Sequence, residues 1–442
     1  GTVITGTLVA GSIGKDEEVE VFPGGRRLRV RGIQVHSQRA ERAYAGQRTA
    51  LNLAGVETGE LERGMVLTLP GRFQASERVD AELLLLPSAR PLKQGARVHF
   101  HQGTAERIAE VRFFDREQLR PGQQAFVQLR LSAPVLLLPG DRFVIRQFSP
   151  VLTIGGGRVL DAQARKHKRG EAGLLPYWQT LAGEDRGKIL EVLVARDPRG
   201  EVEERELVAR TGWREQELRG AVEELVAAGR LRRVAEVPRT VADPARLAEL
   251  GRQALASLDA FHRKEPLLEG ISKGELKEQV FGRAADALFD AVMGELTGRG
   301  ELVVAGDTVK RAGRTVTLSQ EEQEAKRVIE RAFAQAGLSV PAVKEVLSKV
   351  QVEAKRAQKI VLILVREKAL VKVTEELLFH RTALERLPEL LRRYKGEKGE
   401  RLSVPAFKEL TGITRKYAIP LLEYLDRRRV TRRVGDQRQI LV

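Results

Sequence analysis

Basic side chains gather at the end of the chain in a pattern that suits binding to phosphates. Residues 413–442 hold eight lysines and arginines against three aspartates and glutamates. Arg415 and Lys416 follow a Thr411-Gly412 turn and open a segment with helical apolar spacing. The start of a helix has free backbone N–H groups and the positive end of the helix dipole, which both favour an anion. The sequence therefore predicts a phosphate site at residues 415 and 416.

Further arginines flank a predicted β-hairpin after this helix. Arg432 and Arg433 precede a Gly435-Asp436 turn, and Arg438 follows it. Successive side chains on a strand point to opposite faces, so only one of Arg432 and Arg433 is expected to face a ligand from the strand itself. All three arginines are candidate nucleic-acid contacts.

Two features of the same helix have alternative interpretations. Tyr417 either stacks on an unpaired base or packs against Leu421. Arg427, Arg428 and Arg429 either extend the binding surface or satisfy the carbonyl groups at the end of the helix. A-form RNA hides the edges of its bases in a deep major groove, so an RNA hairpin is expected to be bound through phosphates and loop bases.

Composition excludes several classes of protein. The chain has 442 residues, a formal charge of +16 and no cysteine, which excludes disulfides, thiol nucleophiles and cysteine zinc sites. His99 and His101 share one face of a predicted strand, but two ligands do not make a zinc site. No apolar run is long enough to span a membrane, and no export signal is present. We expect a cytoplasmic protein with three to five domains, an anionic partner and no membrane partner.

The sequence of residues 1–168 predicts an all-β structure. Short alternating runs separated by Gly and Pro turns predict two β-barrels, at 1–70 and 77–168, with a seam at Pro70–Glu77. The turn at Pro23-Gly24-Gly25 predicts a hairpin. Gly155-Gly156-Gly157 is not followed by the helix of a phosphate loop, and we interpret it as a tight bend that closes the second barrel.

From residue 183 the apolar spacing becomes helical, and a unit of about 60 to 70 residues recurs. Each unit predicts helix, turn, helix and a small hairpin, which is a winged helix. We expect four, at 183–240, 262–318, 319–376 and 397–442, with helical connectors at 244–261 and 379–395. The segment Val340–Glu345 repeats as Val404–Glu409.

Several of these segments carry a family resemblance. Gly1–Gly11 resembles the first strand of domain II of translational GTPases related to elongation factor Tu. The blocks Arg29–His36 and Ala45–Leu53 are similar to the selenocysteine-specific branch, SelB. Thr414–Asp426 and Thr431–Asp436 are close to the last module of that family.

The resemblance spans essentially the whole chain and implies a fold and a function. The fold is multidomain, with two all-β barrels of the domain II and III type followed by four α+β winged helices in an extended arm. The function is delivery of selenocysteinyl-tRNA to the ribosome at UGA codons. The last winged helix binds the selenocysteine insertion hairpin of the mRNA, and the protein is expected to be a monomer.

The family also has a GTPase domain, which the residues present do not supply. No Gly-x-x-x-x-Gly-Lys-Ser/Thr motif occurs, and Gly183–Lys188 has the wrong spacing for one. Gly1 falls inside a predicted strand, so we expect a GTPase domain ahead of it that holds GTP and Mg. We expect no cofactor and no catalysis from the 442 residues themselves.

The resemblance also implies an aminoacyl pocket in the first barrel. Related factors place a His and an Asn twelve residues apart, and this spacing gives His36 and Arg48. A selenol is acidic enough to arrive as an anion, and a guanidinium offers that anion a fixed fork of donors. The alternative is that Arg48 is a charge on the barrel rim paired with a surface acid.

Other functions remain as rivals. A winged-helix regulator of transcription with a β-rich N-terminal domain would need several base-reading groups on each recognition helix. The segment Arg283–Phe289 of the second module offers almost none. A fragment of ordinary elongation factor Tu lacks four trailing winged helices, and an enzyme would need an acid–base cluster. Trp213 is expected to pack in the core of the first module, and Trp178 at the junction between the second barrel and the helical arm, rather than to bind RNA.

Overall fold

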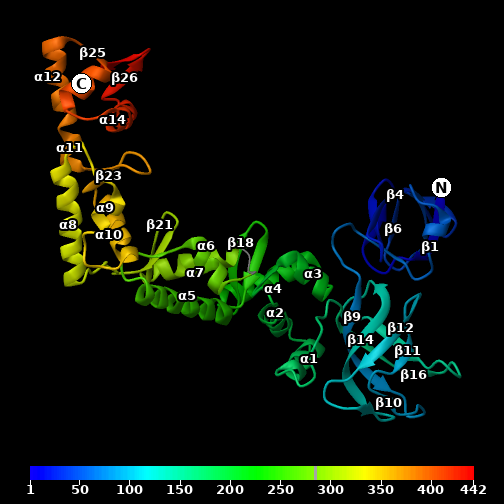
Figure 1. Ribbon diagram of the computed structural model, residues 1–442. Coiled ribbons are helices and arrows are strands. Elements are labelled where there is room, and N and C mark those ends of the chain that lie inside the picture. The colour runs from blue at the N-terminus through cyan, green and yellow to red at the C-terminus, as the bar shows by residue number, and fades with distance from the viewer. Residues whose placement is uncertain (283–285) are drawn as a thin grey trace. The chain divides into compact units, whose positions relative to one another are not determined.

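The computed structural model describes residues 1–282 and 286–442 (Figure 1). Contacts within the chain divide it into two units, Gly1–Arg252 with Phe281–Glu295, and Gln253–Val280 with Leu296–Val442. Arg283, the first residue of the segment weighed above for DNA binding, lies outside the described residues. Within the described part of the chain, no helix combines the length and the apolar character needed to cross a membrane.

The first β domain is a six-stranded antiparallel sheet with a small second sheet. Its strands run in the order β1-β7-β4-β3-β8, with β5 paired to β4, and β2 pairs with β6. Alternating apolar residues such as Val30 and Leu53 point inward and are fully buried. The strands are β1 (Thr2–Thr7), β2 (Ser12–Gly14), β3 (Glu18–Phe22), β4 (Arg26–Val35), β5 (Gln38–Ala40), β6 (Arg42–Tyr44), β7 (Arg48–Ala54) and β8 (Val66–Thr68).

The second β domain is a closed barrel in the order β11-β12-β14-β9-β16-β15. Its strands are β9 (Ser76–Leu85), β11 (Arg97–Gln102), β12 (Ala105–Arg112), β14 (Gln124–Val135), β15 (Arg142–Arg146) and β16 (Thr153–Asp161). The short strands β10 (Leu92–Lys93) and β13 (Gln118–Leu119) form a separate pair. The barrel interior is apolar, with Leu83, Phe100 and Leu129 fully buried.

The three glycines 155–157 correct one expectation. They are not a tight bend, because they lie within β16 and pair with both β15 and β9. A Cβ atom at Gly157 would lie 1.8 Å from the carbonyl oxygen of Glu82. Glycine is therefore needed for the close approach of neighbouring strands, which alternation of apolar residues does not reveal.

The first winged-helix module follows helix α1 (Leu174–Ala182). It contains α2 (Arg186–Ala195), β17 (Glu201–Glu203), α3 (Glu204–Thr211), α4 (Glu215–Ala227), β18 (Arg232–Glu236) and β19 (Arg239–Ala242). Its three strands form a sheet in the order β17-β19-β18. Trp178 of α1 is buried in the core of this module, which confirms its predicted packing role, and Trp213 packs against the same core.

The second module repeats this pattern with a three-stranded sheet, whereas the sheet of the third module has two strands among the described residues. The second has α5 (Pro244–Lys264), β20 (Ile271–Ser272), α6 (Lys273–Val280), α7 (Asp286–Gly298), β21 (Leu302–Ala305) and β22 (Thr308–Arg311). The third has α8 (Gln320–Ala336), α9 (Val343–Leu347), α10 (Ala354–Arg366), β23 (Leu370–Lys372) and β24 (Leu378–His380). Helix α5 occupies the segment where the sequence indicated a connector.

The last module follows α11 (Arg381–Glu385). It has α12 (Leu387–Lys398), β25 (Arg401–Ser403), α13 (Val404–Thr411), α14 (Arg415–Arg427), β26 (Thr431–Val434) and β27 (Gln437–Ile440). The sheet order is β25-β27-β26, the same as in the first module. One continuous apolar cluster runs from Ile329 of α8 to Leu425 of α14 and Ile440 of β27. The third and last modules therefore share a core.

Candidate nucleic-acid interface

The N-terminus of α14 is exposed and lacks a side-chain cap. Thr414 is the residue before the helix, and its side chain makes no capping hydrogen bond. Arg415 and Lys416 occupy the first turn, and both are exposed. The turn before them needs Gly412, whose φ of 68° is in the left-handed region. This arrangement presents two cations and free backbone N–H groups at one point, as a phosphate site requires.

Tyr417 lies beside this site and is half-buried. Its hydroxyl donates a hydrogen bond of 3.0 Å to the carbonyl oxygen of Val340, in the third module. The ammonium nitrogen of Lys416 lies 5.6 Å from the centre of the Tyr417 ring. The hydroxyl of Tyr417 is thus hydrogen-bonded within the protein, and its ring lies next to the Lys416 ammonium group.

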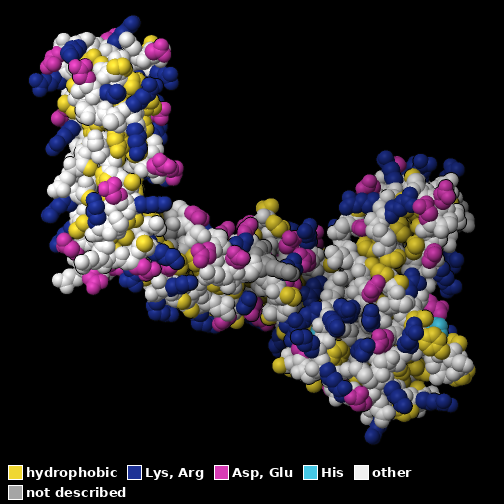
Figure 2. Space-filling model, in the orientation of Figure 1, with side chains coloured by type: hydrophobic (Ala, Val, Ile, Leu, Met, Phe, Trp, Pro, Cys, Tyr) yellow, Lys and Arg dark blue, Asp and Glu magenta, His cyan; other side chains and the backbone are white. Residues whose placement is uncertain are grey.

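The wing of the last module carries the second group of cations. Arg432 and Arg433 on β26 are exposed. The Nε atom of Arg433 donates to the carbonyl oxygen of Gly435 over 3.3 Å, and within the described part of the chain neither arginine has a carboxylate partner. Lys and Arg side chains project from the last module on the face drawn in Figure 2.

Arg438 does not belong with these exposed cations. Its side chain is only 7% exposed, and Nε lies 3.0 Å from Oδ2 of Asp426. Thr431 donates from Oγ1 to the other carboxylate oxygen of Asp426, over 2.6 Å. Arg438 therefore ties β27 to the end of α14, and its guanidinium is not available to a phosphate in this conformation.

The three arginines at the end of α14 differ in their contacts, and Arg427 follows neither of the two interpretations. Nη2 of Arg427 donates to the carbonyl oxygen of Val373 over 3.0 Å, so Arg427 binds the third module. Arg428 and Arg429 are exposed. Arg429 has a φ of 57°, which is unusual for a residue other than glycine.

The residues of the aminoacyl candidate lie at adjacent strand ends. Strand β4 pairs with β7 in a register that ends at Val35 opposite Thr49. Arg48 begins β7 and His36 follows the end of β4, so both lie next to this last pair along the backbone. Both are exposed, and His36 has a φ of 51° in the turn after β4. No ion pair is recorded for Arg48 among the described residues, whereas nearby Arg42 binds Glu17 and Ser12.

The segment Gly183–Lys188 leads into helix α2. Within Gly183–Lys188, Asp185 caps α2 by accepting a hydrogen bond of 3.0 Å from the Lys188 amide. The Lys188 ammonium nitrogen lies 3.3 Å from the same carboxylate. No group of three or more potential metal ligands occurs in the ranges 1–282 and 286–442. His99 and His101 lie side by side on β11 next to Glu106.

A buried polar cluster joins the second barrel to α1, and no sequence motif indicates it. Oδ2 of Asp80 accepts hydrogen bonds of 2.7 Å from the Trp178 indole and from Nε2 of His167. Gln128 donates to Oδ1 over 2.8 Å. Burial raises the pKa of Asp80, and the hydrogen bond and charge of His167 oppose that shift.

The neighbouring carboxylate of Asp161 extends this cluster into the first module. Its Oδ2 accepts from the Tyr177 hydroxyl and from Nη2 of Arg210, each over 2.8 Å. Burial raises the pKa of Tyr177 well above its usual value, and the Asp161 charge adds to this. The cluster makes Asp80 and Asp161 structural groups, because each has its charge or polarity satisfied by neighbours.

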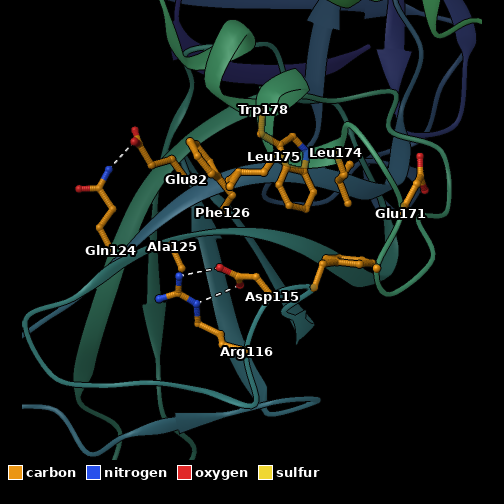
Figure 3. Close-up of a pocket in the computed structure, with 12 residues that line it drawn as sticks. Glu82, Asp115, Arg116, Gln124, Ala125, Phe126, Glu171, Leu174, Leu175 and Trp178 are labelled. Carbon is orange, nitrogen blue, oxygen red and sulfur yellow. Dashed lines mark hydrogen bonds and ion pairs between the residues drawn. The ribbon is translucent and has the colours of Figure 1, made fainter.

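A cavity of about 510 Å³ opens at the same junction (Figure 3). Phe126, Leu175 and Trp178 form apolar walls, and Glu82, Asp115 and Arg116 lie at its edges. Asp115 binds Arg116, and Glu82 binds Arg158. The charges around this cavity are therefore already paired within the protein.

Comparison with known families assigns most of these parts. Residues 1–68 match the model of elongation factor Tu domain 2, and residues 78–166 match the β-barrel domain of selenocysteine-specific elongation factor. Residues 255–310 and 393–440 match two winged-helix models of elongation factor SelB. These matches define the class as a translation factor related to elongation factor Tu.

Whole-chain relatives narrow the class. The chain is 34% identical over all of its 442 residues to the selenocysteine-specific elongation factor of Desulfomicrobium baculatum, of which it covers 69%. It is 21% identical over 99% of its length to the factor of the same name from Haemophilus influenzae, covering 68% of it. The chain therefore belongs to the selenocysteine-specific elongation factor family, SelB.

A solved structure supports the same fold. The crystal structure of a bacterial selenocysteine-specific elongation factor, EF-Sec, aligns with a TM-score of 0.63 and 22% identity, over 100% of this chain and 67% of that one. At this identity the match bears on the fold alone. The predicted architecture of β domains followed by winged helices is confirmed, and membership of this family disfavours the alternative of a DNA-binding regulator.

Proposed function

We propose that this chain delivers selenocysteinyl-tRNA to the ribosome at UGA codons and holds the selenocysteine insertion hairpin of the mRNA through its last winged helix. Membership of the SelB family supports the general role. The observation that carries the RNA assignment is the exposure of four cations on the last module. These are Arg415, Lys416, Arg432 and Arg433, none of which has a carboxylate partner among the described residues.

The proposed RNA contacts are to phosphates rather than to base edges. Arg415 and Lys416 add charge to a helix N-terminus, and Arg432 and Arg433 extend from the wing. Arg438 is left out because Asp426 holds it. Tyr417 is also left out as a base-stacking group, because its hydroxyl is bonded to Val340. The RNA is proposed to lie against the start of α14 and the wing.

Hairpin binding is tested with the 442-residue chain and a labelled RNA hairpin from downstream of a UGA codon in a bacterial selenoprotein message. Each phosphate contact that is lost should lower the slope of log affinity against log salt by about 0.7–0.9. We expect such a decrease for Arg415→Ala and for Arg432→Ala. Arg219→Ala, in α4 of the first module, is the control. If the control weakens binding as much, the positive charge acts diffusely and the site is wrong.

We propose that Arg48 and His36 contact the selenolate of the aminoacyl group. The proposal rests on their neighbouring positions at the ends of β7 and β4 and on the lack of a recorded acid partner for Arg48 among the described residues. GTP and Mg are proposed to be held by a GTPase domain of the family. The complete factor is proposed to act as a monomer in the cytoplasm.

The pocket is tested in this chain joined to a family GTPase domain and loaded with GTP. Arg48→Ala should weaken binding of selenocysteinyl-tRNA by about tenfold or more, because a charge-assisted bond contributes about 1.5–3 kcal/mol. Seryl-tRNA should be affected much less. Arg42→Ala is the matched control, because Arg42 is already paired with Glu17. Equal losses for both tRNAs would mean that Arg48 has a structural role.

A further inference from the structure

Helix α14 is attached to the third module at both of its ends. Near its start, the Tyr417 hydroxyl donates to the carbonyl oxygen of Val340 over 3.0 Å. At its end, Nη2 of Arg427 donates to the carbonyl oxygen of Val373, also over 3.0 Å. Tyr417 and Tyr424 pack against the core that the two modules share. The side of α14 that carries Tyr417 and Tyr424 is therefore covered by the third module. This side is not exposed to an RNA groove.

The acceptor at Val340 is available because of a difference between two copies of one sequence motif. In the last module the motif begins at Val404, which is the first residue of α13. In the third module the motif begins at Val340, but helix α9 begins only at Val343. Val340 thus lies outside the helix, where its carbonyl oxygen can accept a hydrogen bond from another module.

Tyr417 also touches the proposed phosphate site. The Lys416 ammonium nitrogen lies 5.6 Å from the centre of the Tyr417 ring, within the range of a cation–π contact. A lysine side chain on an exposed helix start has many rotamers, and holding it near one position reduces the entropy lost on binding. The ring that holds Lys416 is itself fixed by Val340.

We propose that Tyr417 is a positioning residue through which the third module fixes Lys416 for RNA binding. Tyr417 then contacts the RNA only through Lys416. This inference rests on the proposed function, because it requires that Lys416 binds a phosphate. The inference gives the third module a role in RNA affinity that does not depend on the lysines and arginines of that module.

The experiment is a double-mutant cycle in the 442-residue chain, with the same labelled hairpin as probe. Tyr417→Leu should lower affinity about threefold to tenfold and should reduce the salt slope by up to about 0.7–0.9, because Lys416 is no longer held at the phosphate. In a Lys416→Ala background the same substitution should change affinity by less than about twofold. Tyr417→Phe, which keeps the ring but loses the bond to Val340, should have an intermediate effect.

The control is Tyr424→Leu, on the same helix and half-buried in the same shared core. It should reduce thermal stability without changing the salt slope. If Tyr417→Leu and Lys416→Ala have additive effects and the slope stays constant for Tyr417→Leu, the tyrosine stacks on a base and the positioning role is overturned. If Lys416→Ala has no effect on hairpin binding while Arg415→Ala and Arg432→Ala weaken it, this inference fails and the proposed RNA site stands. If none of these three variants weakens binding, the proposed function itself fails.

Discussion

The first and the last winged-helix modules share a fold but differ in what their charges do. Both have a three-stranded sheet with the same strand order, and both place a glycine with φ near 70° after the helix that precedes the recognition helix. In both, the threonine before that glycine donates to a carbonyl oxygen four residues earlier, over 2.7 Å for Thr211 and 2.6 Å for Thr411. The backbone of the two sites is therefore nearly the same.

The side chains at matching positions differ. Where the last module has Arg415 and Lys416, the first has Glu215 and Gln216. Both wings carry an Arg-Arg pair on their first strand, but Arg233 of the first module is 13% exposed and binds Glu204 and Glu223. Arg433 of the last module is exposed, with no acid partner in the described part of the chain. The two modules therefore differ in whether their arginines are paired with acids or exposed to a ligand, and not in the number of arginines on the wing.

The largest effect is expected from making the last module resemble the first. Arg415→Glu combined with Lys416→Gln should lower hairpin affinity about a hundredfold or more, because two charge-assisted contacts of about 1.5–3 kcal/mol each are lost. Fluorescence titration at several salt concentrations would measure this. The reverse change in the first module, Glu215→Arg with Gln216→Lys, should not create a second binding site. The number of hairpins bound per chain should stay the same as for the unmodified chain. A change of less than threefold for the first variant would contradict the proposed site.

A second test concerns how the first module is held. Its core includes Trp178, whose indole donates to the buried Asp80 of the barrel, whereas the last module is held by the third. Trp178→Phe should reduce the free energy of unfolding by about 2–4 kcal/mol, since a buried acceptor loses a donor and a cavity remains. Chemical denaturation gives the value. Trp213→Phe is the control, with a smaller expected loss, because Trp213 is only partly buried and stacks with Arg186.

The two wing arginines provide a matched pair with opposite outcomes. Arg433→Ala should weaken hairpin binding about tenfold at most and leave the melting temperature unchanged, because the side chain is exposed. Arg233→Ala should leave binding unchanged and reduce stability by about 1–2 kcal/mol, because Glu204 and Glu223 lose a partner. If Arg233→Ala weakens RNA binding as much as Arg433→Ala does, the comparison between the modules is wrong.

The contrast also explains how much the sequence could predict. Alternation of apolar residues indicated most strands of both β domains, and a recurring helix–turn–helix–hairpin pattern indicated the winged helices. The predicted end of the third, at residue 376, falls before its second strand, β24. The alternation of apolar residues could not show that Gly155–Gly157 lie inside a strand, because that depends on how closely neighbouring strands approach. The exposed arginines and the buried ones look alike in sequence.

The same limit applies at the candidate site. Local charge and spacing predict Arg415, Lys416, Arg432 and Arg433, and the structure leaves them exposed. The same pattern predicts Arg438, yet Asp426 binds it from twelve residues away. Asp80 and Trp178 are 98 residues apart in the chain, and their contact depends on the fold of a whole barrel. Pairings over such distances require the tertiary structure.

The smallest effect expected concerns pH and the segment that leads into the first module. Glu171 binds Arg165 and Arg196. Burial raises the pKa of Glu171, but the Lys168 amide and the charges of Arg165, His167 and Arg196 outweigh it, so that the pKa lies below its usual value of 4.5. A carboxyl group whose pKa is lowered on folding stabilises the native state above that usual value. This stabilisation is lost as the pH falls through the folded-state pKa.

Glu171→Gln should therefore lower the melting temperature at pH 7 by an amount that corresponds to about 1 kcal/mol or less. The difference from the unmodified chain should shrink as the pH is lowered below 4.5, the usual pKa of the group. Glu184→Gln, at an exposed glutamate between α1 and α2, is the control and should show no such dependence. Melting curves between neutral and acidic pH give the comparison. A difference that stays constant, or grows, on acidification would show that the charge of Glu171 does not stabilise the link between the barrel and the first module.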